Sequence, residues 1–373
     1  MYVILHAFSR RNSGDGLLVD LTLEALEAAG IDREDCVLLA LDPESFDQDD
    51  ISVARAPGEP SAQVTPKLGF AALEVLVSAV TGARFGRVAK VTSGAKGLIA
   101  VGGGYLVADR FVRQAGVLLN HFAQLSSAAK AGVPTIYLPQ SIGPMKGTVG
   151  RLAKSRLTQM DRIYVRDDLT MSEMGSANAR RIGDLAVMKL GREIEAIEPI
   201  APAGKTILIA RDLPADGDYT TRLQKLAASV SDPVWAVQAD TQGPRSDRAF
   251  YQRLGYDDGG SMSDLMAQGT PGVVISVRLH GAIAALLAGR PSIHLAYERK
   301  GWGAYEDLGI AEFVHDARTF DPERVAAQAK ELQSDPSNFW NRIRAAAPAL
   351  ERQYNDMVSD LRERLLGPSA TPK

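Results

Sequence analysis

Short apolar segments rich in strand-forming residues alternate, along almost the whole chain, with longer segments of helical periodicity. The pattern begins with a strand at 2–8, a helix at about 17–28 and a second strand at 37–41. Strands that alternate with helices are joined by crossover connections, which build a parallel sheet with helices on its faces. The alternation therefore predicts an α/β protein made of Rossmann-like, doubly wound sheets.

A break in this pattern divides the chain. At 373 residues the chain is long enough for two or three domains of about 150 residues each. Periodicity fails around 192–204, where prolines and small residues are concentrated, and then resumes. We expect an N-terminal α/β domain over 1–198 and a second over 199–373, the second ending in a helical region. Two such domains facing each other across a cleft are the predicted architecture.

Charge and composition exclude several classes of protein. The net charge is −3, from 42 basic and 45 acidic side chains, which argues against nucleic-acid binding through an overall basic field. Cys36 is the single cysteine, so neither a disulfide framework nor a multi-cysteine metal site is expected. No apolar run reaches the roughly 18 residues that span a bilayer, and the first residues lack the order of a signal peptide. We expect a cytoplasmic protein.

Candidate ligand-binding residues follow the predicted strands, because ligands of parallel sheets bind beyond the carboxyl ends of the strands. After the first strand, Asn12, Gly14 and Asp15 lie where the backbone amides of a starting helix can hold an anion or sugar hydroxyls. The alternative is that Asn12 or Asp15 only caps this helix.

Three consecutive glycines, Gly102, Gly103 and Gly104, follow the strand predicted at 97–101. They allow a ligand to approach the backbone closely, or they form a tight structural turn. Their spacing is not the G-x-G-x-x-G of dinucleotide-binding proteins, and no P-loop lysine–serine pair follows them.

Two arginines follow predicted strands in different domains. Arg166 comes directly after the strand at 163–165, and Arg278 comes after the strand at 273–277 with His280 close behind it. An arginine beside a helix N-terminus suits a carboxylate or phosphate, and a histidine there can transfer protons. The alternatives are an ion pair of Arg166 with the adjacent aspartates and a purely structural histidine.

The residues in these places resemble the polysaccharide pyruvyl transferase family over nearly the full length of the chain. The matching segments are NSGD at 12–15, VGGG at 101–104, VPTIYLPQSIGPM at 133–145, VRDDLT at 165–170, MSDLMAQ at 262–268 and VVISVRLHGAIAALLAGRPSIHLAYERKG at 273–301. The last segment is the most specific, because Arg-x-His, a small-residue helix, Gly-x-Pro, a strand, Tyr and Lys occur in one run.

The resemblance implies a glycosyltransferase-B-like pair of domains and an enzyme that uses phosphoenolpyruvate as co-substrate. The enzyme would transfer the pyruvyl group to two hydroxyls of one sugar, in a polysaccharide or its lipid-linked precursor, forming a cyclic ketal and releasing phosphate. No metal and no further cofactor are expected. The first domain would be the acceptor side and carry Arg166, and the second would bind the donor.

By this similarity Arg166, Arg278, Leu279 and His280 occupy donor-binding positions. Two arginines suit the carboxylate and the phosphate of the donor, and His280 is the candidate for proton transfer. Substrate-binding positions are also assigned in other matching segments: Gln140, Ser141, Tyr297 and Lys300. Tyr297 and Lys300 are alternatively a surface pair.

The other histidines are expected to be structural. His121 falls in a predicted helix, and His6 and His294 fall in predicted strands. His315 is assigned to an acidic loop without a role.

Two segments, 84–96 and 146–156, each contain four basic residues and no acidic one. One interpretation is a solvated face. The other is a dock for a lipid-linked diphosphate or an anionic membrane surface, which predicts peripheral association at the inner face of the membrane.

Two other functions remain open from the sequence. A nucleotide-sugar glycosyltransferase of the same architecture would need acidic or base-stacking residues for a ribose and a base in the second domain, and neither stands out. The other alternative is a non-catalytic protein that binds glycans or acts as a scaffold. The presence of Arg166, Arg278 and His280 argues against it.

Overall fold

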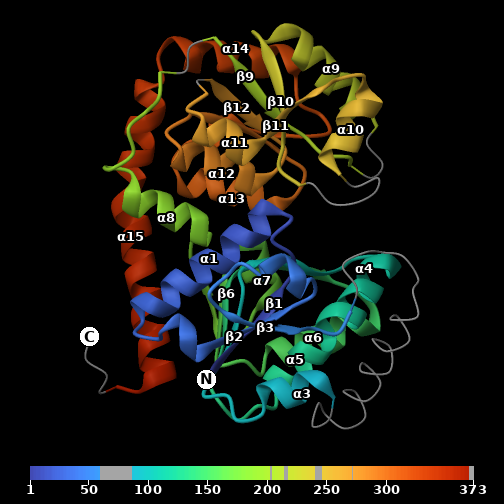
Figure 1. The fold of residues 1–373 in the computed structure, drawn as a ribbon, viewed down its shortest axis with the longest axis vertical. Helices are drawn as coiled ribbons and strands as arrows, with labels where there is room; N and C mark the ends of the chain where they lie inside the picture. Colours follow the sequence, from blue (N-terminus) through green and yellow to red (C-terminus); the bar gives the residue numbers. More distant parts are fainter. Residues whose placement is uncertain (59–85, 202–203, 214–216, 240–245, 271, 369–373) are drawn as a thin grey trace. The chain divides into compact units, whose positions relative to one another are not determined.

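Two parallel sheets, one in each of two units of the chain, account for the alternation seen in the sequence. The computed structural model describes residues 1–58, 86–201, 204–213, 217–239, 246–270 and 272–368, without the side chains of residues 299 and 300. Unit 1 comprises Met1–Arg10, Asp15–Leu185 and Tyr354–Lys373, and unit 2 comprises Arg11–Gly14 and Ala186–Gln353. Figure 1 shows the helices and strands of each unit.

Unit 1 contains an eight-stranded parallel sheet with the order β3-β2-β1-β4-β6-β7-β8, in which β5 pairs with β6 as a side branch. Its strands are β1 (Tyr2–Ala7), β2 (Cys36–Ala40), β3 (Ser52–Arg55), β4 (Leu98–Ala100), β5 (Gly103–Ala108), β6 (Thr135–Met145), β7 (Arg162–Val165) and β8 (Ala179–Arg181). The order runs outward in both directions from the β1–β4 pair, which makes the sheet doubly wound.

Helices cover the strands of unit 1. All six residues of β1 are buried, as expected for a strand with helices on both faces. In Figure 1, α1 lies on one side of these strands, and α5 and α6 lie on the other. The helices described in this unit are α1 (Ser13–Ala28, from Asp15 onward), α3 (Arg87–Thr92), α4 (Phe111–Gly116), a π-helix (Val117–His121), α5 (Phe122–Ala128), α6 (Gly147–Leu157) and α7 (Asp168–Met174).

Unit 2 contains a six-stranded parallel sheet with the order β11-β10-β9-β12-β13-β14. Its strands are β9 (Thr206–Ile209), β10 (Pro233–Val237), β11 (Asp258–Ser261), β12 (Val273–Ser276), β13 (Ser292–Ala296) and β14 (Val314–Asp316). The order reverses between β9 and β12, which pair with Ile209 opposite Ser276. In parallel sheets ligands bind at such a reversal, beyond the carboxyl ends of the strands.

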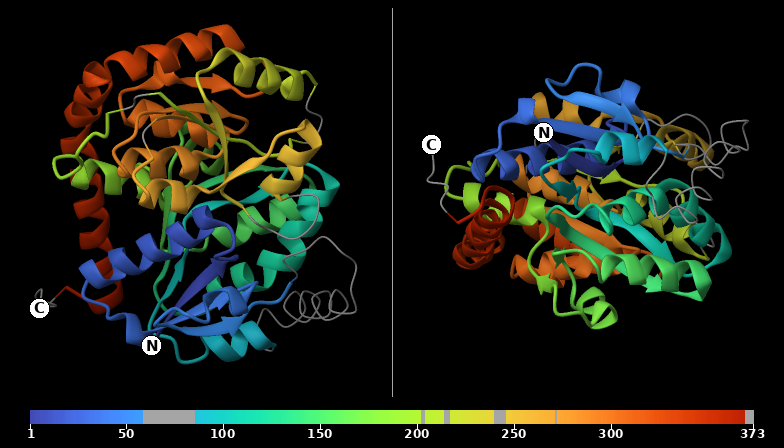
Figure 2. Two further views of the ribbon diagram at one scale, coloured as in Figure 1. Left: turned by 45° about the horizontal axis from the view of Figure 1, so that its top comes forward. Right: turned by 90° about the horizontal axis from the view of Figure 1, so that it is seen from below.

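The helices of unit 2 surround this sheet, as the left panel of Figure 2 shows. They are α8 (Leu185–Glu193), α9 (Tyr219–Ser229), α10 (Asp247–Leu254), α11 (Met262–Ala267), α12 (Leu279–Leu287), α13 (Arg299–Asp307), α14 (Pro322–Ser334) and the first part of α15 (Ser337–Leu366). The small apolar residues of α12 pack closely: Ala282, Ile283, Ala285 and Leu286 are fully buried.

The end of α15 belongs to unit 1. Asp360 accepts a hydrogen bond from the Tyr164 hydroxyl at 2.7 Å and pairs with Arg162 at 3.1 Å. Arg362 donates to the carbonyls of Ala28 and Ala29 at 2.7 and 3.2 Å, which covers the C-terminal end of α1. The last turns of α15 are thus held by side-chain contacts to elements that lie far away in the sequence.

The predicted α/β class and the two parallel sheets are confirmed. Periodicity also predicts helices at 68–82 and at about 111–131 and a strand at 134–138. The π-helix interrupts the helix at 111–131, and the strand at 134–138 continues to Met145. The sequence analysis missed β8, β11 and β14, because these short edge or near-edge strands lack apolar runs. The helix expected at 68–82 and Arg84 lie outside the described residues.

The predicted domains, 1–198 and 199–373, differ from the two units in three places. Ala186–Glu193 of α8 pack with unit 2, Tyr354 onward packs with unit 1, and Arg11–Gly14 pack with unit 2. The assignment of acceptor and donor to the two domains stays a prediction. Within the described ranges, no helix is long and apolar enough to cross a bilayer.

Candidate functional site

The end of β12 positions Arg278 at the start of α12. The Ser276 hydroxyl accepts a hydrogen bond from the Arg278 amide at 3.1 Å and donates to the Arg278 carbonyl at 2.8 Å. This local loop sets Arg278 as the N-cap residue of α12, and its own side chain makes no capping hydrogen bond. Leu279, the next residue, is buried, so its side chain packs in the core.

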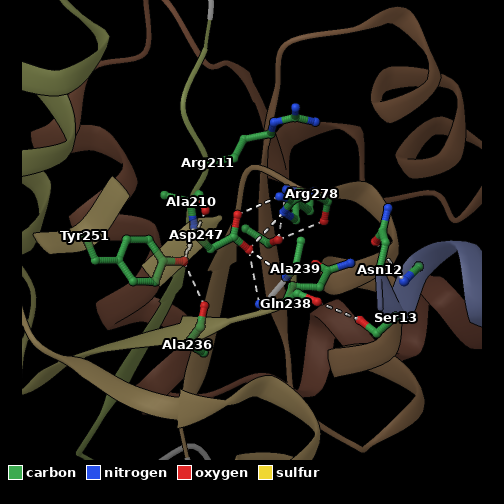
Figure 3. Close-up of polar contacts among 12 residues, drawn as sticks. Asn12, Ser13, Ala210, Arg211, Ala236, Gln238, Ala239, Asp247, Tyr251 and Arg278 are labelled. Carbon is green, nitrogen blue, oxygen red and sulfur yellow. Dashed lines mark hydrogen bonds and ion pairs between the residues drawn. The ribbon is translucent and has the colours of Figure 1, made fainter. Parts of the chain in front are cut away.

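A buried carboxylate holds the Arg278 side chain. Arg278 Nε donates to Asp247 Oδ2 at 3.2 Å, and Nη2 donates to Oδ1 at 2.5 Å, which is a bidentate pair. Burial is the largest single influence on the pKa of Arg278 and lowers it, but the charge and the hydrogen bond of Asp247, together with nearby tyrosines, raise this pKa above its ordinary value. Asp247 Oδ2 also accepts the backbone amides of Gln238 and Ala239 at 3.2 and 2.8 Å (Figure 3). Asp247 thus links the end of β10 to the end of β12.

The loop of residues 11–14 joins this site. Asn12 forms an antiparallel bridge with Ala239, and the Ser13 hydroxyl donates to the Gln238 carbonyl at 3.3 Å. Figure 3 shows the hydrogen bond between Ser13 and Gln238 at the end of β10. Within the loop, the Asn12 side chain accepts a hydrogen bond from the Gly14 amide at 3.2 Å.

Gly14 lies directly against His280. A Cβ atom at Gly14 would be 3.1 Å from both Cβ and Nδ1 of His280 and 3.3 Å from Nε2 of Gln238. A larger residue would therefore displace the imidazole. Unit 2 thus brings Asn12, Gly14, Arg278 and His280 to one place, although the sequence analysis assigned Asn12 and Gly14 to the other domain. The binding and catalytic roles of these residues stay predictions. Asp15 belongs to unit 1.

Two further residues at this edge were missed by the sequence analysis. Gln238 follows β10, and its buried Oε1 has no hydrogen-bond partner in the described structure. Arg211 follows β9, and its Nη1 donates to the Tyr297 hydroxyl at 2.9 Å. The rule that identified Arg278, a polar residue just after a buried strand, would also have found both.

Tyr297, a predicted substrate-binding residue, contacts Arg211 in two ways. Besides the hydrogen bond, the guanidinium carbon lies 5.3 Å from the centre of the Tyr297 ring, within the range of cation–π contacts. Tyr297 follows β13, next to β12 in the sheet. The side chain of Lys300 lies outside the described set, so its predicted role stays a prediction.

In unit 1, Arg166 is buried in a polar cluster. Its Nε donates to the Ser141 hydroxyl at 3.0 Å, and its Nη1 pairs with Asp184. The ion pair is therefore made with Asp184, whereas Asp167 caps α7 through the Thr170 amide at 2.7 Å. Arg166 Nη2 is buried and has no hydrogen-bond partner among the described residues.

The glycine run lies beside Gln140 of β6, with Gly103 opposite Gln140 in the β5–β6 pair. A Cβ at Gly102 would be 2.8 Å from the Pro139 carbonyl oxygen, so close packing of the backbones explains this glycine. Gly103 and Gly104 begin β5 rather than a turn. Gln140 Nε2 donates to the Tyr105 hydroxyl at 2.9 Å and to the Val101 carbonyl at 3.3 Å. Substrate binding by these residues stays a prediction.

Comparison with known proteins decides the family. The family model for polysaccharide pyruvyl transferase matches residues 12–236. The chain belongs to the polysaccharide pyruvyl transferase family. The match includes the loop at 11–14 from Asn12 onward, Arg166 and Arg211, whereas the segment with Arg278 and His280 lies beyond it. No curated protein sequence matches the chain.

Comparison with solved structures identifies the fold of this chain. S. aureus MnaA, in a co-structure with UDP, has a TM-score of 0.54 at 11% identity and covers 100% of this chain and 98% of its own. LpCGTa in complex with UDP has a TM-score of 0.53 at 13% identity, covering 98% and 99%. A UDP-glucose: anthocyanidin 3-O-glucosyltransferase in complex with UDP has a TM-score of 0.51 at 12% identity, covering 98% of each chain. The fold is that of the GT-B glycosyltransferases.

The histidines of this pyruvyl transferase family member differ in their surroundings. His6 and His294 are buried at 2% exposure each, which confirms the core position expected for them. His6 Nδ1 lies 3.1 Å from His121 Nδ1, and His6 Nε2 lies 3.0 Å from the Tyr137 hydroxyl. His315 lies in β14 and bonds Gln328 at 2.6 Å, so its assignment to a loop was wrong.

Among the described residues, no group of three or more His, Cys, Asp or Glu side chains is arranged to hold a metal ion. The strand ends of unit 2 carry two arginines, Arg211 and Arg278, the imidazole of His280 and the N-terminus of α12. These groups can bind an anion and transfer a proton.

Proposed function

We propose that this chain transfers the pyruvyl group of phosphoenolpyruvate to two hydroxyls of one sugar, forming a cyclic ketal and releasing phosphate. Membership of the pyruvyl transferase family supports the transfer of a pyruvyl group. The observation that carries the donor assignment is Arg278, which is fixed by Asp247 beside His280 where the strand order of unit 2 reverses. Cation, imidazole and helix start together suit an anion that must receive a proton.

In the proposed reaction, the vinyl carbon of the donor receives a proton and becomes a methyl group. The neighbouring carbon becomes electron-poor, and one sugar hydroxyl adds to it. The bond from this carbon to the phosphate oxygen breaks, phosphate leaves, and the second hydroxyl closes the ketal. Of the two hydroxyl protons, one balances the proton taken up by the vinyl carbon and the other leaves with phosphate. His280 is the proposed acid for the vinyl carbon.

The ion pair of Arg278 with Asp247 supports this chemistry because it holds the guanidinium group in one orientation. Asp247 occupies the Nε and Nη2 side of the guanidinium, so the remaining donors of Arg278 point in a fixed direction. The first amides of α12 add partial positive charge at the same point. A phosphate bound there would lie beside His280 without a reorganisation of the site.

Arg166, in unit 1, stays a predicted donor-binding residue. Its charge is compensated by Asp184, and its buried Nη2 is the part of the guanidinium that the described protein leaves without a partner. Arg166 bonds Ser141 and Asp184 through two separate nitrogens, Nε and Nη1, an arrangement that the single nitrogen of lysine does not reproduce.

We further propose that the acceptor is a lipid-linked saccharide. On α4, Phe111 and Val112 are 84% and 75% exposed, and on α6, Leu152 is 41% exposed. The two helices are adjacent, because a Cβ at Gly147 would lie 2.9 Å from the Gln114 side chain. The exposed basic residues Arg110, Lys146 and Arg151 and the partly exposed Arg113 flank these apolar side chains. Apolar side chains amid basic ones suit a membrane surface with anionic lipids.

Donor binding tests the proposed function. Isothermal titration calorimetry of the full chain should detect phosphoenolpyruvate, and phosphate release should depend on an added saccharide. Arg278→Lys should lose about 2–4 kcal/mol of donor binding, because lysine cannot pair with Asp247 and the anion together.

The matched control is Arg248→Lys, which alters a surface pair of α10 with Asp258 and should bind normally. Binding of UDP-sugars in place of phosphoenolpyruvate would contradict the proposal and favour a glycosyltransferase. Normal donor affinity in Arg278→Lys would remove this residue from the donor site.

A further inference from the structure

Arg211 and Arg278 occupy equivalent places on neighbouring strands. Ile209 of β9 lies opposite Ser276 of β12, and the Val277 amide donates to the Ile209 carbonyl at 2.8 Å. Each arginine is the second residue beyond this pair, so both leave the sheet at the same edge. Adjacent strands lie about 4.8 Å apart, which allows both side chains to contact one small ligand.

The guanidinium groups of Arg211 and Arg278 differ in their hydrogen-bond partners. Arg278 uses the edge formed by Nε and Nη2 for Asp247. Arg211 uses Nη1 for the Tyr297 hydroxyl, and its Nε is buried without a hydrogen-bond partner in the described residues. Arg278 binds a carboxylate through its Nε and Nη2 edge. The corresponding edge of Arg211 makes no hydrogen bond to the described protein.

The charge of Arg211 is also uncompensated. Across the described chain, no carboxylate forms an ion pair with Arg211, and its neighbour Asp212 pairs with Arg253 at 2.6 Å. Arg278, in contrast, is neutralised by Asp247. Arg211 therefore brings to this edge of the sheet a positive charge with which no described carboxylate pairs.

Two tyrosines hold Arg211 in this orientation. Tyr297 accepts from Nη1 and lies with its ring against the guanidinium. The Tyr219 hydroxyl donates to the Arg211 carbonyl at 3.0 Å, which fixes the backbone beyond β9. A guanidinium held on one side, with its bidentate edge turned away from the tyrosine hydroxyl, is preorganised for a planar anion.

We propose that Arg211 binds the carboxylate of the donor through Nε and Nη2, while Arg278 and the first amides of α12 bind its phosphate. The assignment rests on the proposed function, because it supposes a donor with two anionic groups. The planar carboxylate matches the flat edge of Arg211, and the phosphate matches a helix start. Tyr297 is then a positioning residue that orients Arg211, rather than a direct substrate ligand.

The test compares phosphoenolpyruvate with inorganic phosphate, which lacks the carboxylate. Calorimetry on the full chain should show that Arg211→Gln binds phosphoenolpyruvate about 30-fold more weakly or worse, the scale of lost charge-assisted hydrogen bonds. Binding of inorganic phosphate should be unchanged. Arg211→Lys should remain at least about tenfold weaker, since one ammonium cannot form the bidentate contact.

Two further variants separate function from folding. Arg253→Gln removes a surface arginine that pairs with the residue next to Arg211, and it should bind both anions normally. Tyr297→Phe keeps the ring but loses the hydroxyl, so KM for phosphoenolpyruvate should rise about three- to tenfold with kcat unchanged. Thermal melting of each variant should match the parent.

These experiments distinguish failure of the Arg211 assignment from failure of the proposed function. If the parent protein binds no phosphoenolpyruvate, the proposed function is wrong. If the parent binds it and Arg211→Gln binds it equally well, the assignment of Arg211 is overturned alone. Equal weakening for phosphoenolpyruvate and inorganic phosphate would overturn the carboxylate assignment as well.

Discussion

His280 provides the imidazole of the candidate site in unit 2. The imidazole packs against Gly14, which limits its freedom to rotate. The neighbouring Arg278 is held by its bidentate pair with Asp247, so its guanidinium group keeps a fixed position relative to the imidazole of His280. A group positioned in this way can deliver a proton without first being ordered.

His280→Gln should reduce kcat about 10²–10⁴-fold, the usual contribution of general acid–base catalysis, while much of the donor affinity is kept. The reason is that glutamine retains a hydrogen-bond donor but cannot transfer a proton. Single-turnover kinetics and calorimetry on the same variant measure both quantities. His315→Gln, which alters a histidine of β14, should keep turnover and serves as the control. A near-normal kcat in His280→Gln at saturating donor would show that the acid lies elsewhere.

At the residue scale, the sequence predicted that Arg278, His280, Asn12 and Gly14 follow a strand or begin a helix, and the structure places them so, whereas their binding roles stay predictions. Asp247 could not be found in this way. It lies at the start of α10 with no motif around it, and its role depends on the amides of Gln238 and Ala239, which only the folded chain brings to it. A partner that is distant in sequence leaves no local signal.

At the scale of elements, the π-helix at Val117–His121 brings His121 against His6. His6 has a φ of 67°, a backbone conformation rarely adopted by residues with a side chain. π-helical turns are rare and are often found at functional sites. Burial lowers the pKa of His121 to about 4, and burial together with His121 lowers the pKa of His6.

These lowered pKa values predict how stability depends on pH. Below about 6.5 an unfolded chain protonates its histidines, whereas the buried pair stays neutral, so the unfolded state binds more protons and stability falls as the pH falls. His121→Gln should reduce the slope of the unfolding free energy between pH 6.5 and 5 by about 1 kcal/mol per pH unit. Urea unfolding at several pH values measures this slope.

Tyr137→Phe is the matched control for the histidine pair. It removes a hydrogen bond to His6 without removing a histidine, so it should lower stability and leave the slope unchanged. An unchanged slope in His121→Gln would mean that His121 is protonated in the folded protein within this range.

Helices α4 and α6 carry the surface proposed to bind membranes. Phe111→Glu combined with Val112→Glu should weaken binding to phosphatidylglycerol vesicles about tenfold or more, because apolar contact is lost and acidic charge is added. Vesicle co-sedimentation measures this binding, and added salt should weaken it in the parent protein. Leu169→Glu, on α7, changes another exposed apolar residue, of 57% exposure, and should bind normally.

The same variant separates membrane binding from catalysis. Turnover on a lipid-diphosphate acceptor should fall more than turnover on a soluble saccharide. Equal binding by parent and variant would exclude this surface. Of the basic residues, Arg151 is a better target than Lys154, because Lys154 is half-buried and donates to the Glu173 carbonyl.

At the scale of the whole molecule, the two sheets could be predicted because periodicity records the alternation of strands and helices. The division into units could not be predicted fully. Residues after Gln353 return to unit 1 through contacts such as Asp360 with Tyr164, and four residues of the first loop pack with unit 2. Composition and periodicity describe neighbours in the sequence, whereas these contacts join residues far apart along the chain.

The chain passes between its two units after Arg10, Gly14, Leu185 and Gln353. A genetic recombination with one crossover, after Leu185, would therefore combine the 11–14 loop of one parent with the Gln238 and His280 of another. In the same recombinant, the end of α15 would come from the second parent, whereas its contact residues Arg162 and Tyr164 would come from the first. Chimeras between relatives of different specificity should fold well only when all four junctions are exchanged together. We expect relatives to diversify mainly by point substitution within each unit, since shuffling whole domains would separate Gly14 from His280.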